Sequence, residues 1–244
     1  MKKIIVLLTL LSIVAALFSS CGAKATARAG LGVYSDLTSD GSAIGGNNGH
    51  TTYTHTAAAI ILDKEGRITA CDIDAAEVRV EYTSSGKPSV KSDYKTKGEL
   101  GDSYGMSAAG AKLEWYAQRD AFCKTVIGKT IREVKESVTQ SGKGSQDIIS
   151  AGCTIAVDGF VAAIVEAEKN ARAVSGEPDS IKLTVKTSAM GREATDSAVG
   201  SINAVTEISA DVSGVNTLKE RAEFSIWFSK TGILQPEPEK SATS

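Results

Sequence analysis

Apolar and polar residues alternate with a period of two over two neighbouring stretches of the chain, which is the pattern of half-buried strands. The first stretch runs from Tyr53 to Ile61, and the second from Ile68 to Tyr82. The segment Asp63-Lys64-Glu65-Gly66 between them has the composition of a turn, so the pattern predicts a β-hairpin. Residues 83–100 then bring glycine, proline and several lysines, and they predict a solvated connection.

Helical periodicity replaces this pattern in the middle of the chain. Apolar residues fall on one arc between Ser107 and Ile127, which predicts an amphipathic helix that ends at Gly128. Thr130 and Glu133 have the spacing of a capping box and predict a second, shorter helix. Apolar residues at helical spacing mark a third helix, namely Phe160, Ile164, Ala167 and Ala171.

Strand periodicity returns after residue 178 in three further stretches. A weak internal repeat accompanies it, because the triplets Leu31-Gly32-Val33 and Leu183-Thr184-Val185 each precede, by about 30 residues, a strand that ends in Asp-x-x-Gly. Chance similarity is the alternative. The predicted fold class is α+β: a twisted antiparallel sheet with two or three helices on one face, plus a smaller, mostly β C-terminal segment.

The chain begins with the features of a signal peptide. Lys2 and Lys3 precede an apolar run from Ile4 to Phe18, which is shorter than the ~20 residues that a membrane-spanning helix needs. Residues 17–21 resemble a bacterial lipobox, and this resemblance implies a diacylglycerol on the thiol of Cys21. We therefore expect the protein at the extracytoplasmic face of the cell membrane, lipid-anchored through Cys21. An ordinary cleaved signal with a chance cysteine is the alternative.

Charge and cysteine content exclude several classes of function. Lysine and arginine total 27 against 29 aspartates and glutamates, with no block of like charge, so no nucleic-acid partner is expected. Beyond Cys21 the cysteines are Cys71, Cys123 and Cys153. An odd number cannot all pair, and their spacing fits no zinc or haem motif. Buried free thiols are the expectation.

No nucleophile-and-base set is visible along the chain. His50 and His55 have no cysteine or carboxylate at ligand spacing beside them, so we expect them at a strand surface or in solvent. The glycine-rich residues 41–49 lack the order of a dinucleotide fingerprint and precede a strand. They predict a flexible loop.

The most informative segment for chemistry is residues 147–154, Asp-Ile-Ile-Ser-Ala-Gly-Cys-Thr, immediately before the third helix. It resembles the acidic-x-x-Ser-Gly-Ala-Thr signature of the FMN-binding domain family, and the similarity extends from about Thr52 to Ala171. The exported lipoprotein branch of that family, which it resembles most, carries FMN through a phosphoester to a threonine. The resemblance implies an electron-transfer flavoprotein with redox partner proteins.

Two registers of this motif are open, and they involve the candidate cofactor-binding residues Asp147, Ser150, Gly152, Cys153 and Thr154. With Asp147 and Ser150 aligned, Cys153 takes the acceptor position and lacks the hydroxyl that a phosphoester needs. With Gly152 and Thr154 aligned, Thr154 is the acceptor. The second register keeps the chemistry.

The start of the third helix also suits an anion. Small residues leave N–H groups accessible where a helix begins near Asp158, and the helix dipole favours a phosphate there. A helix capped by Asp158 itself, with no ligand, is the alternative. Tyr104, Trp115 and Tyr116 can stack on a flavin ring, although Trp115 lies on the apolar stripe and favours the core.

These observations divide the chain into a signal peptide (1–20), a lipidated tether (21–29), an FMN-binding-like domain (30–177), a partial β-rich repeat (178–235) and a disordered tail (236–244). The predicted function is a lipid-anchored flavoprotein that transfers electrons outside the cytoplasm. A cofactor-free envelope binding module on the same fold, which recognises a small ligand or a partner, is the alternative. No catalytic set supports a hydrolase.

Overall fold

Long antiparallel strands dominate the computed structural model, which describes residues 27–214 and 216–238. The predicted signal peptide, Cys21 and most of the predicted tether and tail lie outside the described residues. One sheet has the strand order β4-β3-β2-β1-β5 and the other the order β6-β7-β8-β9. The fold class is α+β, as predicted.

The strands are β1 (Ala27–Gly41), β2 (Gly49–Leu62), β3 (Ile68–Tyr82), β4 (Pro88–Ser89), β5 (Arg172–Val174), β6 (Ile181–Arg192), β7 (Gly200–Val212), β8 (Asn216–Phe228) and β9 (Leu234–Gln235). The helices are α2 (Lys97–Leu100), the 3-10 turn η1 (Gly101–Tyr104), α3 (Trp115–Val126), α4 (Ile131–Glu136), α5 (Gln146–Ser150) and α6 (Asp158–Lys169). Among the described residues, no helix is both long enough and apolar enough to cross a bilayer.

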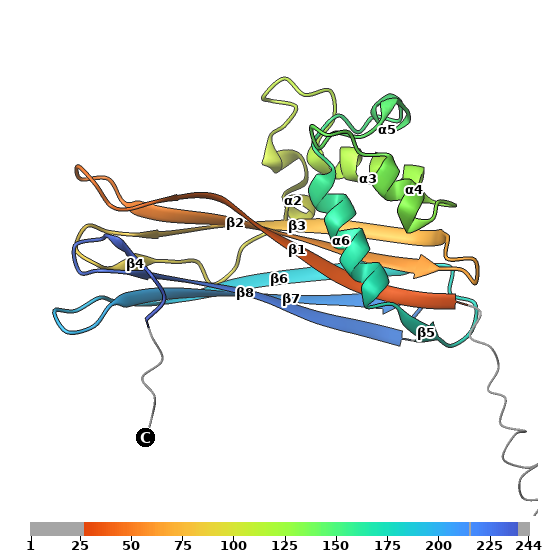
Figure 1. Ribbon diagram of the computed structural model, residues 1–244. Helices are drawn as coiled ribbons and strands as arrows, with labels where there is room; N and C mark the ends of the chain where they lie inside the picture. The colour runs from red at the N-terminus through yellow and green to blue at the C-terminus, as the bar shows by residue number, and fades with distance from the viewer. Residues whose placement is uncertain (1–26, 215, 239–244) are drawn as a thin grey trace, which may run out of the picture.

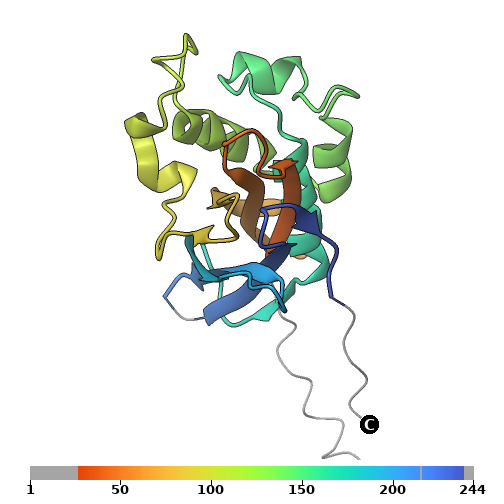
Figure 2. The same cartoon turned by 90° about the vertical axis from the view of Figure 1, so that its left-hand side faces the viewer.

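Three layers stack on one another, with the helices above the first sheet and the second sheet below it (Figures 1 and 2). In β2, Ala58 and Ile60 pack against the helices, whereas Ala57 and Ala59 pack against the second sheet. Because both faces are covered, residues 57–62 are buried without interruption. The C-terminal β segment is therefore not an appendage: it supplies half of the second hydrophobic core.

Helix α6 lies directly on β1, and two glycines make this contact possible (Figure 1). A Cβ atom added to Gly30 would lie 1.9 Å from the carbonyl oxygen of Ala167, and one added to Gly32 would lie 2.1 Å from the backbone nitrogen of the same residue. No side chain fits at either position without moving the helix. The length and position of α6 agree with the predicted third helix.

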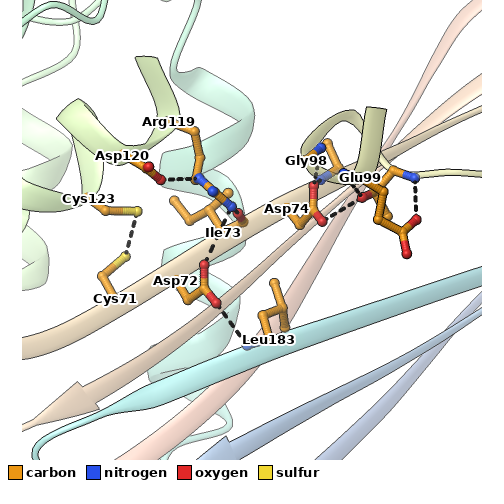
Figure 3. A network of polar contacts seen from close by, with 12 residues as sticks. Cys71, Asp72, Ile73, Asp74, Gly98, Glu99, Arg119, Asp120, Cys123 and Leu183 are labelled. Carbon is orange, nitrogen blue, oxygen red and sulfur yellow. Dashed lines mark hydrogen bonds and ion pairs between the residues drawn. The ribbon is translucent and has the colours of Figure 1, made fainter. Parts of the chain in front are cut away.

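The outer edge of β6 contacts both β3 and the segment between β4 and α2. Asp72 of β3 accepts a hydrogen bond from the Leu183 N–H at 2.9 Å, and the N–H of Tyr94 donates to the Thr187 carbonyl at 3.0 Å. Arg119 of α3 contacts the other oxygen of Asp72 at 3.6 Å (Figure 3). Burial raises the pKa of Asp72, and the Leu183 N–H and the Arg119 guanidinium oppose that rise.

The two triplets that suggested an internal repeat occupy corresponding places in the two sheets. Leu31 and Val185 are buried between the sheets, and each lies on the first strand of a three-strand meander. Each meander ends in the same turn, with the Gly86 N–H donating to the Thr83 carbonyl and the Gly232 N–H donating to that of Ser229. A two-residue strand, β4 or β9, follows each turn.

The helix predicted over residues 107–127 is wrong in its first part, because α3 begins only at Trp115. Gly105 ends η1 with a positive φ angle of 84°, and Gly110, with a φ of 93°, interrupts the predicted helix. The Glu114 carboxylate holds these turns by accepting the N–H groups of Met106 at 3.0 Å and Ser107 at 2.8 Å. The periodicity of residues 107–127 predicted one helix, but hydrogen bonds to Glu114 hold the first part of this segment in turns.

Two predicted irregular segments also differ from the structure. Residues 83–100 are largely accessible to solvent, as predicted, but they are not irregular throughout: Tyr94 and Thr96 are buried, and Thr96 with Glu99 forms a capping box at the start of α2. Strand β1 begins at Ala27, inside the predicted tether, because β5 pairs with residues 27–29. Contacts with distant parts of the chain explain both differences, because Tyr94 bridges to Thr187 of β6 and residues 27–29 pair with β5.

Candidate functional site

Residues 147–154 form a short helix followed by a tight turn against α3. Gly152 has a φ of 113° and packs under Leu113, with 3.1 Å between its ideal Cβ position and Leu113 Cδ1. Both the N–H and the hydroxyl of Thr154 donate to Gln118 Oε1, at 2.8 and 3.0 Å. Gln118 is buried, and its Nε2 donates to the Leu113 carbonyl at 2.9 Å. The turn is therefore anchored to the core through one amide side chain.

The five predicted cofactor residues do not converge on one surface. Cys153 is fully buried, and burial raises the pKa of its thiol to about 11. Asp147 and Ser150 are exposed on α5, where the Ser150 hydroxyl contacts Gln146 Nε2 at 3.2 Å. Thr154 is exposed, but its hydroxyl is already engaged. The five residues therefore do not form one shared phosphate pocket, and FMN attachment at Thr154 stays a prediction.

The N-terminus of α6 is occupied by protein groups. The N–H groups of Val157 and Asp158 both donate to the Gly142 carbonyl, at 2.8 and 3.3 Å. The N-cap residue is Val157, which makes no side-chain cap, so the predicted capping role of Asp158 is wrong. Asp158 nevertheless places a carboxylate in the first turn, where a phosphate would otherwise be favoured.

The aromatic residues proposed to stack on a ring have other partners. Trp115 is 5% exposed and packs edge-on against Phe160 at a centroid distance of 5.7 Å, so its predicted core position is confirmed. The Tyr116 hydroxyl donates to Asp102 at 3.1 Å, and the Tyr104 hydroxyl lies 3.4 Å from Glu77. All three rings therefore serve the packing and hydrogen bonding of the helical layer.

His55 is buried, and the prediction of a surface or solvated histidine is wrong. It lies between the sheets beside Phe224, and its Nδ1 is 2.7 Å from the Ser35 hydroxyl. Burial lowers the pKa of His55. Its buried Nε2 has no hydrogen-bond partner within residues 27–214 and 216–238, so this serine–histidine pair lacks the orienting third group of a hydrolase. Only the strand register brings the two residues together.

The outer edge of β1 is open beside this pair. Within the described residues, β5 pairs with that edge only at residues 27–29, and β1 continues to Gly41. The Leu31 carbonyl points outward, because it accepts a hydrogen bond from Asn170 Nδ2 at 3.0 Å. Since outward-pointing backbone groups recur every second residue, those of Val33 and Ser35 point to the same side. No described strand pairs with these outward groups.

Two grooves lie on either side of this edge, and Glu166 lines both. The groove toward the helices has a volume of about 420 Å³ and is largely apolar; its lining includes Tyr34, Val138, Val161, Ala162 and Val165. The groove toward the second sheet has a volume of about 320 Å³ and is polar; its lining includes Val33, Ser35, Asn170, Glu220, Arg221 and Glu223. We name these the apolar groove and the acidic groove.

Comparison with protein-family models, curated protein sequences and solved structures found no match for this chain. Within the part of the chain that the structure describes, no three histidine, cysteine, aspartate or glutamate side chains gather as a metal site. The free edge of β1 with its two grooves is the candidate functional site, because it combines an open strand edge with two surface grooves of different chemistry. Sequence reasoning missed it, because an open strand edge has no residue signature.

Proposed function

We propose that this chain is a cofactor-free binding module that captures an extended segment of a partner protein on the free edge of β1. The predicted lipid on Cys21 would hold the module at the outer face of the cell membrane. The observation that carries the proposal is the outward backbone of Val33 and Ser35, which no described strand pairs and which lies between two grooves of different chemistry. An added strand gains affinity from main-chain hydrogen bonds and specificity from its alternate side chains.

The strand geometry assigns each groove to one set of side chains. Tyr34 pairs with Thr56 and lines the apolar groove, whereas Ser35 pairs with His55 and lines the acidic groove. Side chains of an added strand alternate between the same two faces, because neighbouring strands share their pleat. A bound segment therefore places every second side chain in the apolar groove and the intervening ones in the acidic groove.

The charge of the acidic groove determines which side chains of a bound segment fit it. The acidic groove is lined by three carboxylates, Glu166, Glu220 and Glu223, against one guanidinium, Arg221. Arg221 is paired with Glu223 at 2.7 Å and Lys169 with Glu166 at 2.6 Å. Glu220, which faces the amide of Asn170 at 3.4 Å, is therefore the carboxylate of this groove without a cationic partner among the described residues. Lysine or arginine side chains complement this surface. The partner segment that fits is an extended run of alternating apolar and basic residues.

The test uses a capped heptapeptide that alternates valine and lysine, titrated onto the purified full chain and followed by calorimetry. We expect saturable binding, and at least tenfold weaker binding for the same peptide with N-methylated backbone amides on its pairing edge. A peptide with glutamate in place of lysine should also bind at least tenfold more weakly. Equal binding of all three peptides, or of none, would contradict the proposal.

Three variants locate the site. Val33→Pro removes an outward N–H without removing a bond to β2, so it should weaken peptide binding at least tenfold while the chain stays folded. Glu220→Lys should weaken the lysine peptide and strengthen the glutamate peptide. Glu65→Lys makes the same charge change on the distant β2–β3 turn and should leave both affinities unchanged.

Flavin attachment at Thr154 is the competing proposal, and it has a separate readout. Protein produced together with a flavin transferase would fluoresce on a denaturing gel, and Thr154→Ala would abolish that signal. Such a result, combined with absence of peptide binding, would favour electron transfer over peptide capture.

A further inference from the structure

Two cysteines that are 52 positions apart in the chain meet at the boundary between the helices and the first sheet. Cys71 lies on β3 and Cys123 on α3, and their sulfur atoms are 3.6 Å apart (Figure 3). Cys123 is 8% exposed, and Cys71 is half-buried and packs against the same helical core. Neither sequence spacing nor periodicity brought these residues together.

The geometry suits a covalent bond between them. A disulfide has its sulfurs about 2.05 Å apart, so closing the present gap requires a movement of about 1.5 Å. Rotation of the two side chains can supply part of this movement, and both residues stand on regular elements. A metal is the weaker interpretation, because the described residues hold no third ligand that completes a site.

The third cysteine remains outside this pair. Cys153 is fully buried in the same core, where the backbone of Ile155 hydrogen-bonds its sulfur. Burial raises the pKa of its thiol to about 11, with a smaller contribution from neighbouring Cys123. Cys153 is therefore protonated and shielded at neutral pH, which makes it a poor nucleophile.

The pair lies next to the contacts that join the layers. Cys71 directly precedes Asp72, which holds β6 through the Leu183 N–H, and Cys123 follows Arg119 by one helical turn. A bond between the cysteines therefore fixes α3 to β3 where Arg119 reaches Asp72. It also closes a loop of 52 residues that contains the irregular segment between β3 and α3.

We propose that Cys71 and Cys123 form a structural disulfide, made by exchange with an external disulfide such as that of a thiol oxidoreductase or a small disulfide. One thiol attacks the external disulfide and releases one reduced thiol; the second then attacks the mixed disulfide and releases the other. The two cysteines lose two electrons and two protons, and the external disulfide gains them. Oxidising compartments outside the cytoplasm, where the signal peptide predicts this chain, sustain such bonds.

Their hydrogen bond determines how the pair behaves before oxidation. The pKa of Cys71 is raised well above its ordinary value, first by its hydrogen bond with Cys123 and then by burial. Cys71 is therefore protonated at neutral pH and attacks slowly, which suits a bond made once during folding rather than a catalytic exchange pair.

The experiment uses the full chain with Cys21→Ser, so that an unlipidated Cys21 does not enter the thiol count. After incubation with oxidised glutathione, thiol titration under denaturing conditions should find one free cysteine instead of three, and the intact mass should fall by about 2 Da. Peptide mapping should link Cys71 to Cys123. Three free thiols, a Cys123–Cys153 link, or a stable glutathione adduct would overturn the proposal.

Thermal unfolding tests whether the disulfide stabilises the fold. The oxidised protein should have a Tm about 5–10 °C above that of the protein reduced with a phosphine, because the bond closes a long loop. Cys71→Ser should abolish the difference, whereas Cys153→Ala should retain it. If the Cys71–Cys123 bond is mapped and its reduction leaves the Tm unchanged, its structural role is refuted. The comparison of oxidised with reduced protein needs no substitution at Cys71 or Cys123.

Discussion

The two three-strand meanders, β1–β3 and β6–β8, differ mainly on the face that each turns away from the other. Between the sheets both are apolar: Ala57 and Val78 of the first face Ile208 and Phe224 of the second. The outer face of the first carries Ile60 and further aliphatic residues beneath the helices. The outer face of the second presents exposed charged residues, including Lys186, Glu207 and Arg221.

The residues on its outer face decide how many layers pack on a meander. Apolar residues on the outer face of the first sheet require a cover, and the helices between β3 and β5 supply it. The outer face of the second sheet carries charged residues, so it can face solvent without a covering layer. The open edge of β1 fits this arrangement, because α6 covers the face of β1 and leaves the backbone at its edge uncovered.

The largest expected effect comes from placing a side chain on the outer face of β1. Gly32→Val forces a Cβ into the backbone of α6, and we expect it to lower the free energy of unfolding by about 3 kcal/mol or more. Thr184, at the corresponding place in the second triplet, is exposed, so Thr184→Val should change stability by less than about 0.5 kcal/mol. Chemical denaturation measures both, and similar losses would show that the helical layer does not distinguish the two sheets.

A smaller loss of stability is expected from the turn that follows each meander, and it should be equal in the two. Gly86 and Gly232 adopt φ angles of 72° and 70°, and a Cβ on either would approach atoms of the opposite turn within 3.0 Å. Gly86→Ala and Gly232→Ala should each lower the free energy of unfolding by about 2 kcal/mol. Gly66→Ala, at a positive φ with open space around it, is the control and should cost about 1 kcal/mol. Unequal losses at the first two glycines would mean that their turns are not equivalent.

The smallest effect concerns the interface that the meanders share, where His55 of β2 faces Phe224 of β8. Because burial lowers the folded-state pKa of His55 below 6.5, the unfolded chain takes up its proton first as the pH falls. The free energy of unfolding should therefore decline below pH 6.5, until the pH passes the folded-state pKa. Asp72 acts in the opposite direction at lower pH, because burial raises its pKa.

The variant His55→Phe isolates this contribution. Denaturant unfolding at intervals between pH 7 and pH 5 should give a smaller loss of stability for the variant than for the natural chain. Parallel profiles would show that His55 does not resist protonation between the sheets.

Several elements could be predicted from local sequence because local physics governs them. The capping box of Thr130 and Glu133 begins α4, and both of its hydrogen bonds involve residues three positions apart. Val78, Val80 and Tyr82 share a buried face, as a period of two requires. Cys123 and Cys153 are buried, as expected, whereas Cys71 is half-buried.

Other features depend on residues that meet only in three dimensions. Ser35 and His55 are paired by the register of β1 with β2, and Cys71 approaches Cys123 across 52 positions. The turn at Thr154 is held by Gln118, a contact that motif spacing does not encode. Periodicity reports which face of an element is apolar, but it does not report what covers that face.

By itself, the sequence determined the α+β class, the capped and amphipathic helices and the alternating strands, because each rests on interactions within a few residues. The tertiary structure alone decided that the second meander covers the first, that β1 keeps an open edge, and that two thiols stand within reach of a bond. Those outcomes depend on packing and pairing between distant segments, and the free energy of such contacts is absent from any local window of sequence.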